Sequence, residues 1–527
     1  MDQDDSQPRS GGGTEGSWSG DVEVVAWPRR ERPRSAIAPL REPEALEEIT
    51  WVQRLPILVL VALYVGYFSY ESLRLYATYN YPPFDLAIFD QGLWLLSHLH
   101  APFVTIMGRN LFGDHTSFIL LFLVPIYRLL PEPQGILVIQ TLAIGATALP
   151  IFAIARRLTR SVVIATTMGA VYLLSPALQQ VNLEQFHPEG LQVLVWTLAI
   201  YAAIESRGWL LAVTVALTLL TKEDAVVLVV PLGIWVAARR NWRWGAALVG
   251  TGVAYAVVAN EWVIPAFLGG PTLYSGRIPF GGVSGFLKTL VTSPLQVWRL
   301  VHSQGRLFYL CQMGLSAGWV FLLAPGMAWL ALLAVAENVL SVDPYMHQIF
   351  YHYSLRIVPV LVIASAWAIG RQRLASVRRA LTTSTAACAL VSCVWWGLAP
   401  FSSHPEPIDD AAGAIVAAAM NHLVTDLPAD ASVSAQYPLV SHIDHRQHIY
   451  VWPAPFTTSN WGIPSTAAET LPPPFSVTYL ILPANLGVDD NADIFASISS
   501  AYYVKARSGG LVLYERYRPG PHPAGSP

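Results

Sequence analysis

The chain has 527 residues, of which 53% are hydrophobic and only 13% are charged, and its mean hydropathy is +0.43. Soluble globular domains carry about 25% charged residues, so this composition excludes an ordinary soluble enzyme and predicts a membrane protein with many spans. The formal net charge of -3 gives no sign of a nucleic-acid partner, and in a membrane protein the position of the charges matters more than their sum.

Residues 1–50 are polar and rich in Gly, Ser and Pro, and no apolar stretch begins before residue 55. This composition predicts a disordered tail and does not fit a cleavable signal peptide. Several arginines, the last of them Arg54, precede the first apolar run at 55–76. The positive-inside rule therefore predicts a cytoplasmic tail and a first span that ends on the outer face.

Residues 77–134 are predicted to form the first outer loop, with helices that lie on the membrane surface. The run TSFILLFLVPIYRLL at 116–130 contains Pro125 and has about 15 residues, fewer than the roughly 20 that a spanning helix needs. If this run stays at the surface, the next run, 135–155, travels inward and leaves three arginines in the cytoplasm, Arg156, Arg157 and Arg160.

The same alternation continues along the chain, and every Arg-rich connection falls on the cytoplasmic side. The further apolar runs are 161–179, 190–205, 209–221, 225–238, 245–265, a hairpin over 307–340, 355–370 and 380–400. Together they predict about 11 spans over residues 51–400, in a multi-pass protein of the cell membrane. The predicted topology depends most on the short run 209–221. If that run does not cross the membrane, the orientation of every later span is inverted.

The character of the sequence changes at residue 401. A helical stretch is followed by five short β-like runs, SVSAQ, HIYVW, VTYLIL, AYYVKA and LVLYER. The sequence therefore predicts a mostly α fold, a polytopic membrane helical bundle with a small C-terminal α/β domain over 401–527 that lies outside the cytoplasm.

Ionisable residues inside otherwise apolar sequence collect on the predicted outer side. Such residues are costly near hydrocarbon and are usually functional, although outer loops are also polar for solvation alone. The residues predicted to bind substrate are Arg109, Asp114, His115, His187, Glu189, Lys222, Glu223, Asp224, His352, Tyr353 and Arg356.

Asp85 and Asp90, in YPPFDLAIFDQGLW, are the candidate catalytic residues. Five helical positions separate side chains by roughly 140°, so the two acids are not expected to act as a carboxylate dyad. One is predicted to be the working acid, and the other to support or cap the helix. Asp85 fits an N-cap position, which leaves Asp90 within a helix along the membrane surface.

Metal binding stays open. Histidines and carboxylates are available for a divalent cation, but no HExxH-type spacing occurs, so no metal ligand is assigned. The segment HIDHRQH, with His442, His445 and His448, is more typical of a polar surface or a substrate contact than of a closed metal site.

The segments FDLAIFDQGLW, GDHTSFILLFLVPIYRLL, NLEQFHPEG, TKEDA, YHYS and ADASVSAQYPLVSHIDHRQHIYVWP resemble the DUF2079 family of predicted bacterial integral-membrane proteins, in the same order from about 60 to 515. That family is similar to the GT-C superfamily of membrane glycosyltransferases, which place an acid in the first outer loop and a Thr-Lys at a later outer turn. Asp85 or Asp90 and Thr221-Lys222 occupy matching places, but GDHTS stands where relatives have Lys-Pro-Pro.

This resemblance implies a glycosyltransferase that takes a sugar from a polyprenyl-phosphate-linked donor and gives it to an envelope glycan, lipid or protein. An aspartate would act as general base, and Lys222, Arg356 or Arg109 would stabilise the departing phosphate. The alternatives are a transporter or lipid-binding membrane protein without covalent chemistry, and an inactive scaffold for the α/β domain. A transporter would place ionisable residues at mid-membrane depth, often in two related halves, and neither pattern is seen in the sequence.

Overall fold

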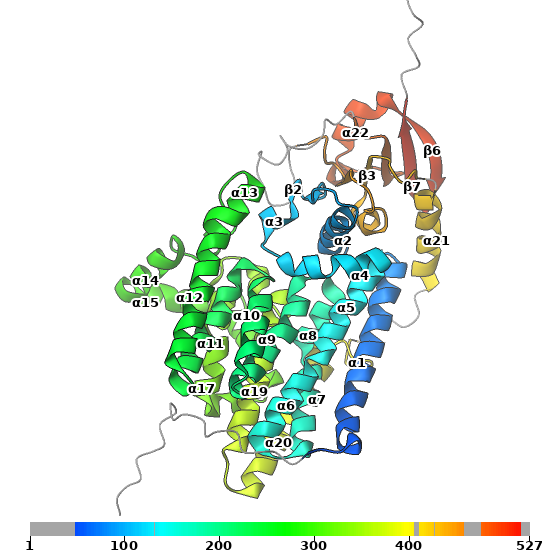
Figure 1. Ribbon diagram of the computed structural model, residues 1–527. Coiled ribbons are helices and arrows are strands. Elements are labelled where there is room, and N and C mark those ends of the chain that lie inside the picture. Colours follow the sequence, from blue (N-terminus) through cyan, green and yellow to red (C-terminus); the bar gives the residue numbers. More distant parts are fainter. Residues whose placement is uncertain (1–47, 131, 405–410, 426, 458–475, 518–527) are drawn as a thin grey trace, which may run out of the picture. The chain divides into compact units, whose positions relative to one another are not determined.

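The computed structural model describes residues 48–130, 132–404, 411–425, 427–457 and 476–517 (Figure 1). The predicted disordered tail, 1–50, lies outside these ranges except for residues 48–50. The helices are α1 (Trp51–Ala77), α2 (Phe84–Ser97), α3 (Leu111–Asp114), α4 (Val124–Leu129), α5 (Pro133–Ala146), α6 (Ala148–Thr159), α7 (Val162–Leu173), α8 (Pro176–Glu184), α9 (Pro188–Ile204), α10 (Gly208–Leu219), α11 (Val226–Arg239), α12 (Trp242–Val258), α13 (Ile264–Leu268), α14 (Gly282–Thr292), α15 (Pro294–Val301), α16 (Arg306–Ser316), α17 (Pro325–Ala328), α18 (Leu332–Leu340), α19 (Val358–Gly370), α20 (Ala375–Trp396), α21 (Ala411–Thr425) and α22 (Ala492–Ile498).

The predicted mostly helical fold is confirmed. Helix α1 packs on α5 and α7, α19 packs on α6 and α20, and α11 packs along α12 (Figure 1). Within the described ranges, four helical stretches are long and apolar enough to cross a bilayer, and the bent pair α7 with α8 adds a fifth. Shorter apolar helices, α9 and α10 among them, fill other predicted spans, so the count of about 11 spans stays a prediction.

The first helix shows how sequence sets an element boundary. Thr50 is its N-cap and forms a capping box with Gln53. The Thr50 hydroxyl accepts from the backbone N–H of Gln53, and the side-chain oxygen of Gln53 accepts from the backbone N–H of Thr50. These bonds satisfy two of the N–H groups that a helix start leaves without partners. The boundary lies four residues before the predicted start of the span at 55.

The Arg-rich connections meet at one end of the bundle. Arg157 of α6 lies 3.2 Å (Nε to Oε1) from Glu205, which follows α9. Arg378 of α20 donates to the Thr159 carbonyl, and Arg240, just after α11, donates to the Ile204 carbonyl. These contacts agree with helices that alternate in direction through the short run 209–221. The side of the membrane that this end faces stays a prediction.

The run at 116–130 does not form one continuous helix. A 3-10 turn, η1 (Phe118–Phe122), is followed by α4, which has Pro125 in its first turn. Six residues of α-helix extend only about 9 Å, too short to cross the hydrocarbon core. Helix α4 instead packs on α2, as expected for a segment outside the spans.

The C-terminal domain contains the predicted sheet. The five strands, in the order β4-β3-β5-β7-β6, correspond one by one to the five β-like runs of the sequence. Strand β3 pairs in parallel with β4 and β5, whereas β7 pairs antiparallel with β5 and β6. The strands are β3 (Val433–Ala435), β4 (Ile449–Val451), β5 (Tyr479–Pro483), β6 (Tyr502–Ser508) and β7 (Leu511–Arg516), and a separate short pair, β1 (Phe103–Val104) with β2 (Arg109–Asn110), lies in the first loop.

Two glycines of α12 offer a matched test of helix packing. A Cβ atom on Gly245 would lie 2.4 Å from the backbone nitrogen of Ala237 in α11. We expect Gly245→Ala to lower the free energy of unfolding by about 1–3 kcal/mol, because the backbone must shift to admit the methyl group. At Gly250 no described heavy atom lies within 4 Å of that position, so Gly250→Ala should leave the thermal unfolding temperature in detergent unchanged or higher. Equal loss in both variants would rule out close α11–α12 packing.

Candidate functional site

Asp85 lies at the start of α2, where the chain enters the helix after Pro82-Pro83. The N-cap is Pro83 and Asp85 lies in the first turn, so the expectation that Asp85 caps the helix is wrong. Its backbone N–H donates to Oε1 of Gln185, which joins α2 to the loop after α8. Its carboxylate keeps 31% of its surface exposed and lies 3.7 Å (Oδ2 to Nε2) from His187. Burial raises the pKa of Asp85 to about 6, although the neighbouring His187 opposes the rise.

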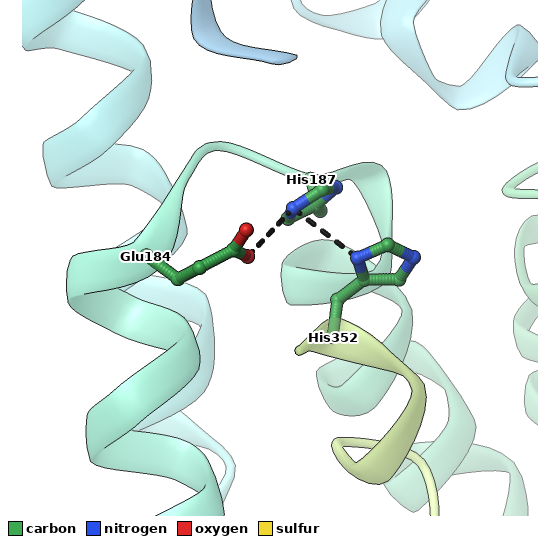
Figure 2. A group of neighbouring side chains, drawn as sticks. All are labelled: Glu184, His187 and His352. Atoms are coloured by element: carbon green, nitrogen blue, oxygen red, sulfur yellow. Dashed lines mark hydrogen bonds and ion pairs between the residues drawn. The ribbon is translucent and has the colours of Figure 1, made fainter. Parts of the chain in front are cut away.

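Two histidines from distant loops meet beside Asp85. Nε2 of His187 lies 3.0 Å from Oε2 of Glu184 and 3.2 Å from Nδ1 of His352, so that one nitrogen faces both partners (Figure 2). Burial opposes the charged form of His187, but Glu184 and Asp85 raise its pKa. The loop between α8 and α9 and the turn before α19 therefore share one hydrogen-bonded chain.

A buried ion pair continues this chain. His352 lies 3.5 Å (Nε2 to Oε1) from Glu189, and the same Glu189 oxygen accepts from Nζ of Lys222 at 2.7 Å. The side chains of Lys222 and Glu189 are only 4% and 7% exposed. The Lys222 ammonium also lies 5.4 Å from the centre of the Tyr353 ring. The TKED turn between α10 and α11 thus reaches the two histidine loops.

A second group of charges comes from the loop after α2, which the sequence predicts to be the first outer loop. Oδ1 of Asp114 accepts from Nη2 of Arg109 at 2.6 Å and from the hydroxyl of Tyr274 at 2.7 Å. Burial alone would raise the pKa of Asp114, but His115, Arg109 and Tyr274 hold it at about 2. His115 in turn bonds Oε1 of Glu223 at 2.8 Å through Nδ1, so this group also reaches the TKED turn.

Arg277 joins the two groups. Its guanidinium lies 4.0 Å from the centre of the Tyr274 ring and 5.8 Å from that of Tyr353, and its Nε lies 3.3 Å from Oδ2 of Asp343. Sequence reasoning missed Arg277 and Tyr274, which lie in the long outer loop 266–305 and match no motif. The available signal was that Arg277 is one of only three Lys or Arg residues in that loop.

Arg356 is held inside the same region by two acids. Its Nη1 lies 3.1 Å from Oδ1 of Asp224, and its Nη2 lies 2.6 Å from Oε2 of Glu337 in α18. Glu337 was also missed, because it follows an apolar run and has no polar neighbour before it. All the residues predicted to bind substrate therefore lie in one connected set of contacts, which we call the outer-loop network.

Asp90 lies apart from the outer-loop network. It is fully buried, accepts from the Tyr127 hydroxyl of α4 at 2.7 Å, and lies 2.9 Å (Oδ2 to Nε2) from His445 of the C-terminal domain. Asp444 directly precedes His445 in the C-terminal domain. Its pKa is raised by burial and by the nearby Asp90. The two candidate acids thus have different neighbours and do not form a dyad.

Two groups of described residues place ligand atoms within 4.8 Å of one another, as a metal ion requires: Glu184 with His187 and His352, and Asp90 with Asp444 and His445. In the first group Nε2 of His187 lies within hydrogen-bonding distance of both neighbours. A single imidazole nitrogen can donate to Glu184 or accept from His352, but it cannot do both at once.

Comparison with known proteins gives a family and a structural likeness. No curated protein matches the chain. The crystal structure of ArnT from Cupriavidus metallidurans in the apo state is similar to it, with 12% sequence identity and a TM-score of 0.45 over 86% of this chain and 98% of that one. No activity follows from a likeness of this extent. Residues 75–478 match the family described as "Predicted membrane protein (DUF2079)", and the chain belongs to that family.

Proposed function

We propose that the chain is a membrane glycosyltransferase that moves a sugar from a polyprenyl-phosphate-linked donor to an envelope acceptor, with Asp85 as general base. The observation that carries this proposal is the outer-loop network. Charged side chains from five separated segments form one set of contacts, and Asp85, which is partly exposed and has its pKa raised to about 6, joins this set through His187. Perturbed acids next to charge clusters are typical of catalytic sites.

The proposed reaction transfers one proton to Asp85 and one sugar to the acceptor. Asp85 accepts the proton of the acceptor hydroxyl while the hydroxyl oxygen bonds to the anomeric carbon of the donor sugar. The bond from that carbon to the phosphate oxygen breaks, and the polyprenyl phosphate leaves with the electron pair. A lipid-linked donor keeps its chain in the bilayer, so its sugar reaches the loops at the helix ends.

The leaving phosphate needs a cation that is not already neutralised. Lys222 is committed to Glu189 at 2.7 Å, and Arg356 is committed to Asp224 and Glu337. Arg277 is the least closely paired of these cations, because its ion pair with Asp343 is 3.3 Å long, against 2.6 Å for Arg109 with Asp114. Its buried Nε makes no hydrogen bond to described residues, a property that it shares with nitrogens of Arg109 and Arg356. We therefore assign the phosphate to Arg277 first, with Lys222 and Arg356 fixing the acids around it.

The proton taken by Asp85 also needs a route away. His187 lies 3.7 Å from Asp85, and the neighbouring acids raise the pKa of His187, so its imidazole can accept this proton. The Asp85 side chain keeps 31% of its surface exposed, so the proton can then pass to solvent.

The proposal is tested by incubating membranes that contain the chain with radiolabelled polyprenyl-phosphate sugars and an envelope extract. Transfer of label into a glycan, lipid or protein, lost in Arg277→Met, supports the enzyme. A donor that binds or crosses the bilayer with its glycosidic linkage intact favours the transporter or lipid-binding alternative instead.

The pH profile should report Asp85. A base works only when deprotonated, and the raised pKa is about 6, so kcat should fall as the pH drops through that value. Because His187 lowers the pKa of Asp85, His187→Gln should move the acid limb to higher pH. If the acid limb of the kcat profile moves to lower pH or disappears in His187→Gln, Asp85 is not the base that titrates.

A further inference from the structure

The group Asp90, Asp444 and His445, which we call the Asp90 cluster, lies outside the outer-loop network and joins α2 to the C-terminal domain. Asp90 and Asp444 are 0% and 1% exposed. The Oδ2 atom of Asp444 is buried and has no hydrogen-bond partner among the described residues. A buried, unpaired carboxylate oxygen is costly, and a second buried carboxylate beside it increases that cost.

Arg446 attracts Asp444 electrostatically but compensates the two acids only in part. It directs its guanidinium to backbone carbonyls, with Nε donating to Ile443 and Nη1 donating to Pro428 and Ala431. Among the described residues no Lys or Arg forms an ion pair with Asp90 or Asp444, and the polar contacts of Asp90 include His445 and the Tyr127 hydroxyl. The cluster thus holds two carboxylates and one imidazole, a donor set suited to a divalent cation.

We propose that the Asp90 cluster binds a divalent cation, with Zn²⁺ as the best match, which fixes the C-terminal domain to α2. Bonds of about 2.0–2.2 Å to nitrogen and oxygen place tetrahedral ligand atoms roughly 3.3 Å apart. Oδ2 of Asp90 lies 2.9 Å from Nε2 of His445, and all three ligand atoms lie within 4.8 Å of one another. Only small side-chain movements are needed to close the site.

The surroundings of the cluster support this role. The Tyr127 hydroxyl donates to the other oxygen of Asp90 at 2.7 Å, as second-layer donors orient the carboxylates that bind metals. It also lies 2.8 Å from Nε2 of His445, so it must move away from that nitrogen when the cation binds. His445 keeps 31% of its side chain exposed, which gives an ion a path to the buried acids. Gln91, the next residue of α2, donates to the Arg446 carbonyl at 3.1 Å, so the cation would reinforce an existing junction.

The test uses the full chain in detergent, stripped with EDTA and then given Zn²⁺ alone. We expect one tightly held Zn²⁺ at this cluster by elemental analysis and a rise of several degrees in unfolding temperature. Asp444→Asn and His445→Gln should lose that ion and that rise. His448→Gln, in the same segment, and His352→Gln, in the other group of converging ligand atoms, should keep both.

The competing account is a proton shared between Asp90 and Asp444 with no metal. It predicts no Zn²⁺-dependent rise in the wild type, and that result overturns the proposal even if Asp444→Asn fails to fold. Loss of the ion in His352→Gln but not in His445→Gln overturns it equally, because the metal would then belong to the outer-loop network.

Discussion

Asp85→Asn is expected to lower the rate of sugar transfer by about 10²–10⁴-fold, the usual contribution of a general base. The asparagine keeps the size of the side chain but accepts no proton. The KM for the donor should change little, because Asp85 acts on the acceptor hydroxyl. Single-turnover transfer in purified membranes measures the effect, and Asp85→Glu should recover part of the rate.

Asp90→Asn is the matched comparison, because it lies on the same helix and has different neighbours. It removes a charge from a fully buried position bonded to Tyr127 and His445, so we expect a lower unfolding temperature. Turnover per folded molecule should stay well above that of Asp85→Asn. If Asp90→Asn is the inactive variant and Asp85→Asn transfers normally, the assignment of the base is wrong.

Lys222→Met is expected to destabilise the protein by about 3–5 kcal/mol. The Lys222–Glu189 pair joins at 2.7 Å with both side chains almost fully buried, and removing one partner leaves an uncompensated charge in a region of low dielectric constant. Reversible chemical unfolding in detergent measures the loss.

The double variant Lys222→Met/Glu189→Leu separates stability from function. Replacing both members of a buried pair by apolar residues is often neutral or stabilising, so most of the lost stability should return. Transfer activity should stay low, because the apolar pair no longer holds His352, which lies 3.5 Å from Glu189 in the wild type. Additive losses in the double-mutant cycle would show that the two side chains do not interact.

Much of the fold was predictable because it follows local pattern. Most of the apolar runs, the interruption at Pro125 and the five β-like runs correspond to observed elements, since hydrophobic period and turn residues act over short stretches. The hairpin predicted over 307–340 instead breaks into the short helices α16, α17 and α18. The bend between α7 and α8 was not predicted. The run at 161–179 predicts one span although it contains Ser175-Pro176, and at that break the helix bends by 44°.

The site was predictable as a set of residues but not as pairs. Polar residues in apolar sequence identified the loops, yet some of the ion pairs depend on packing between distant segments, as for Lys222 and Glu189, which are 33 residues apart. The neighbours of Asp90 likewise depend on the C-terminal domain, whose His445 lies 355 residues beyond Asp90 in the chain. No local pattern contains that contact.

The proposed function requires that the outer-loop network receive the head group of a lipid-linked sugar. A structure of the full chain in a lipid nanodisc with a non-hydrolysable polyprenyl-phosphate sugar analogue would locate that head group. We expect the phosphate against Arg277, with the anomeric carbon facing the Asp85 carboxylate. A head group bound at the opposite end of the helices, in the 610 Å³ groove lined by Arg160, Arg378 and Arg379, would contradict it.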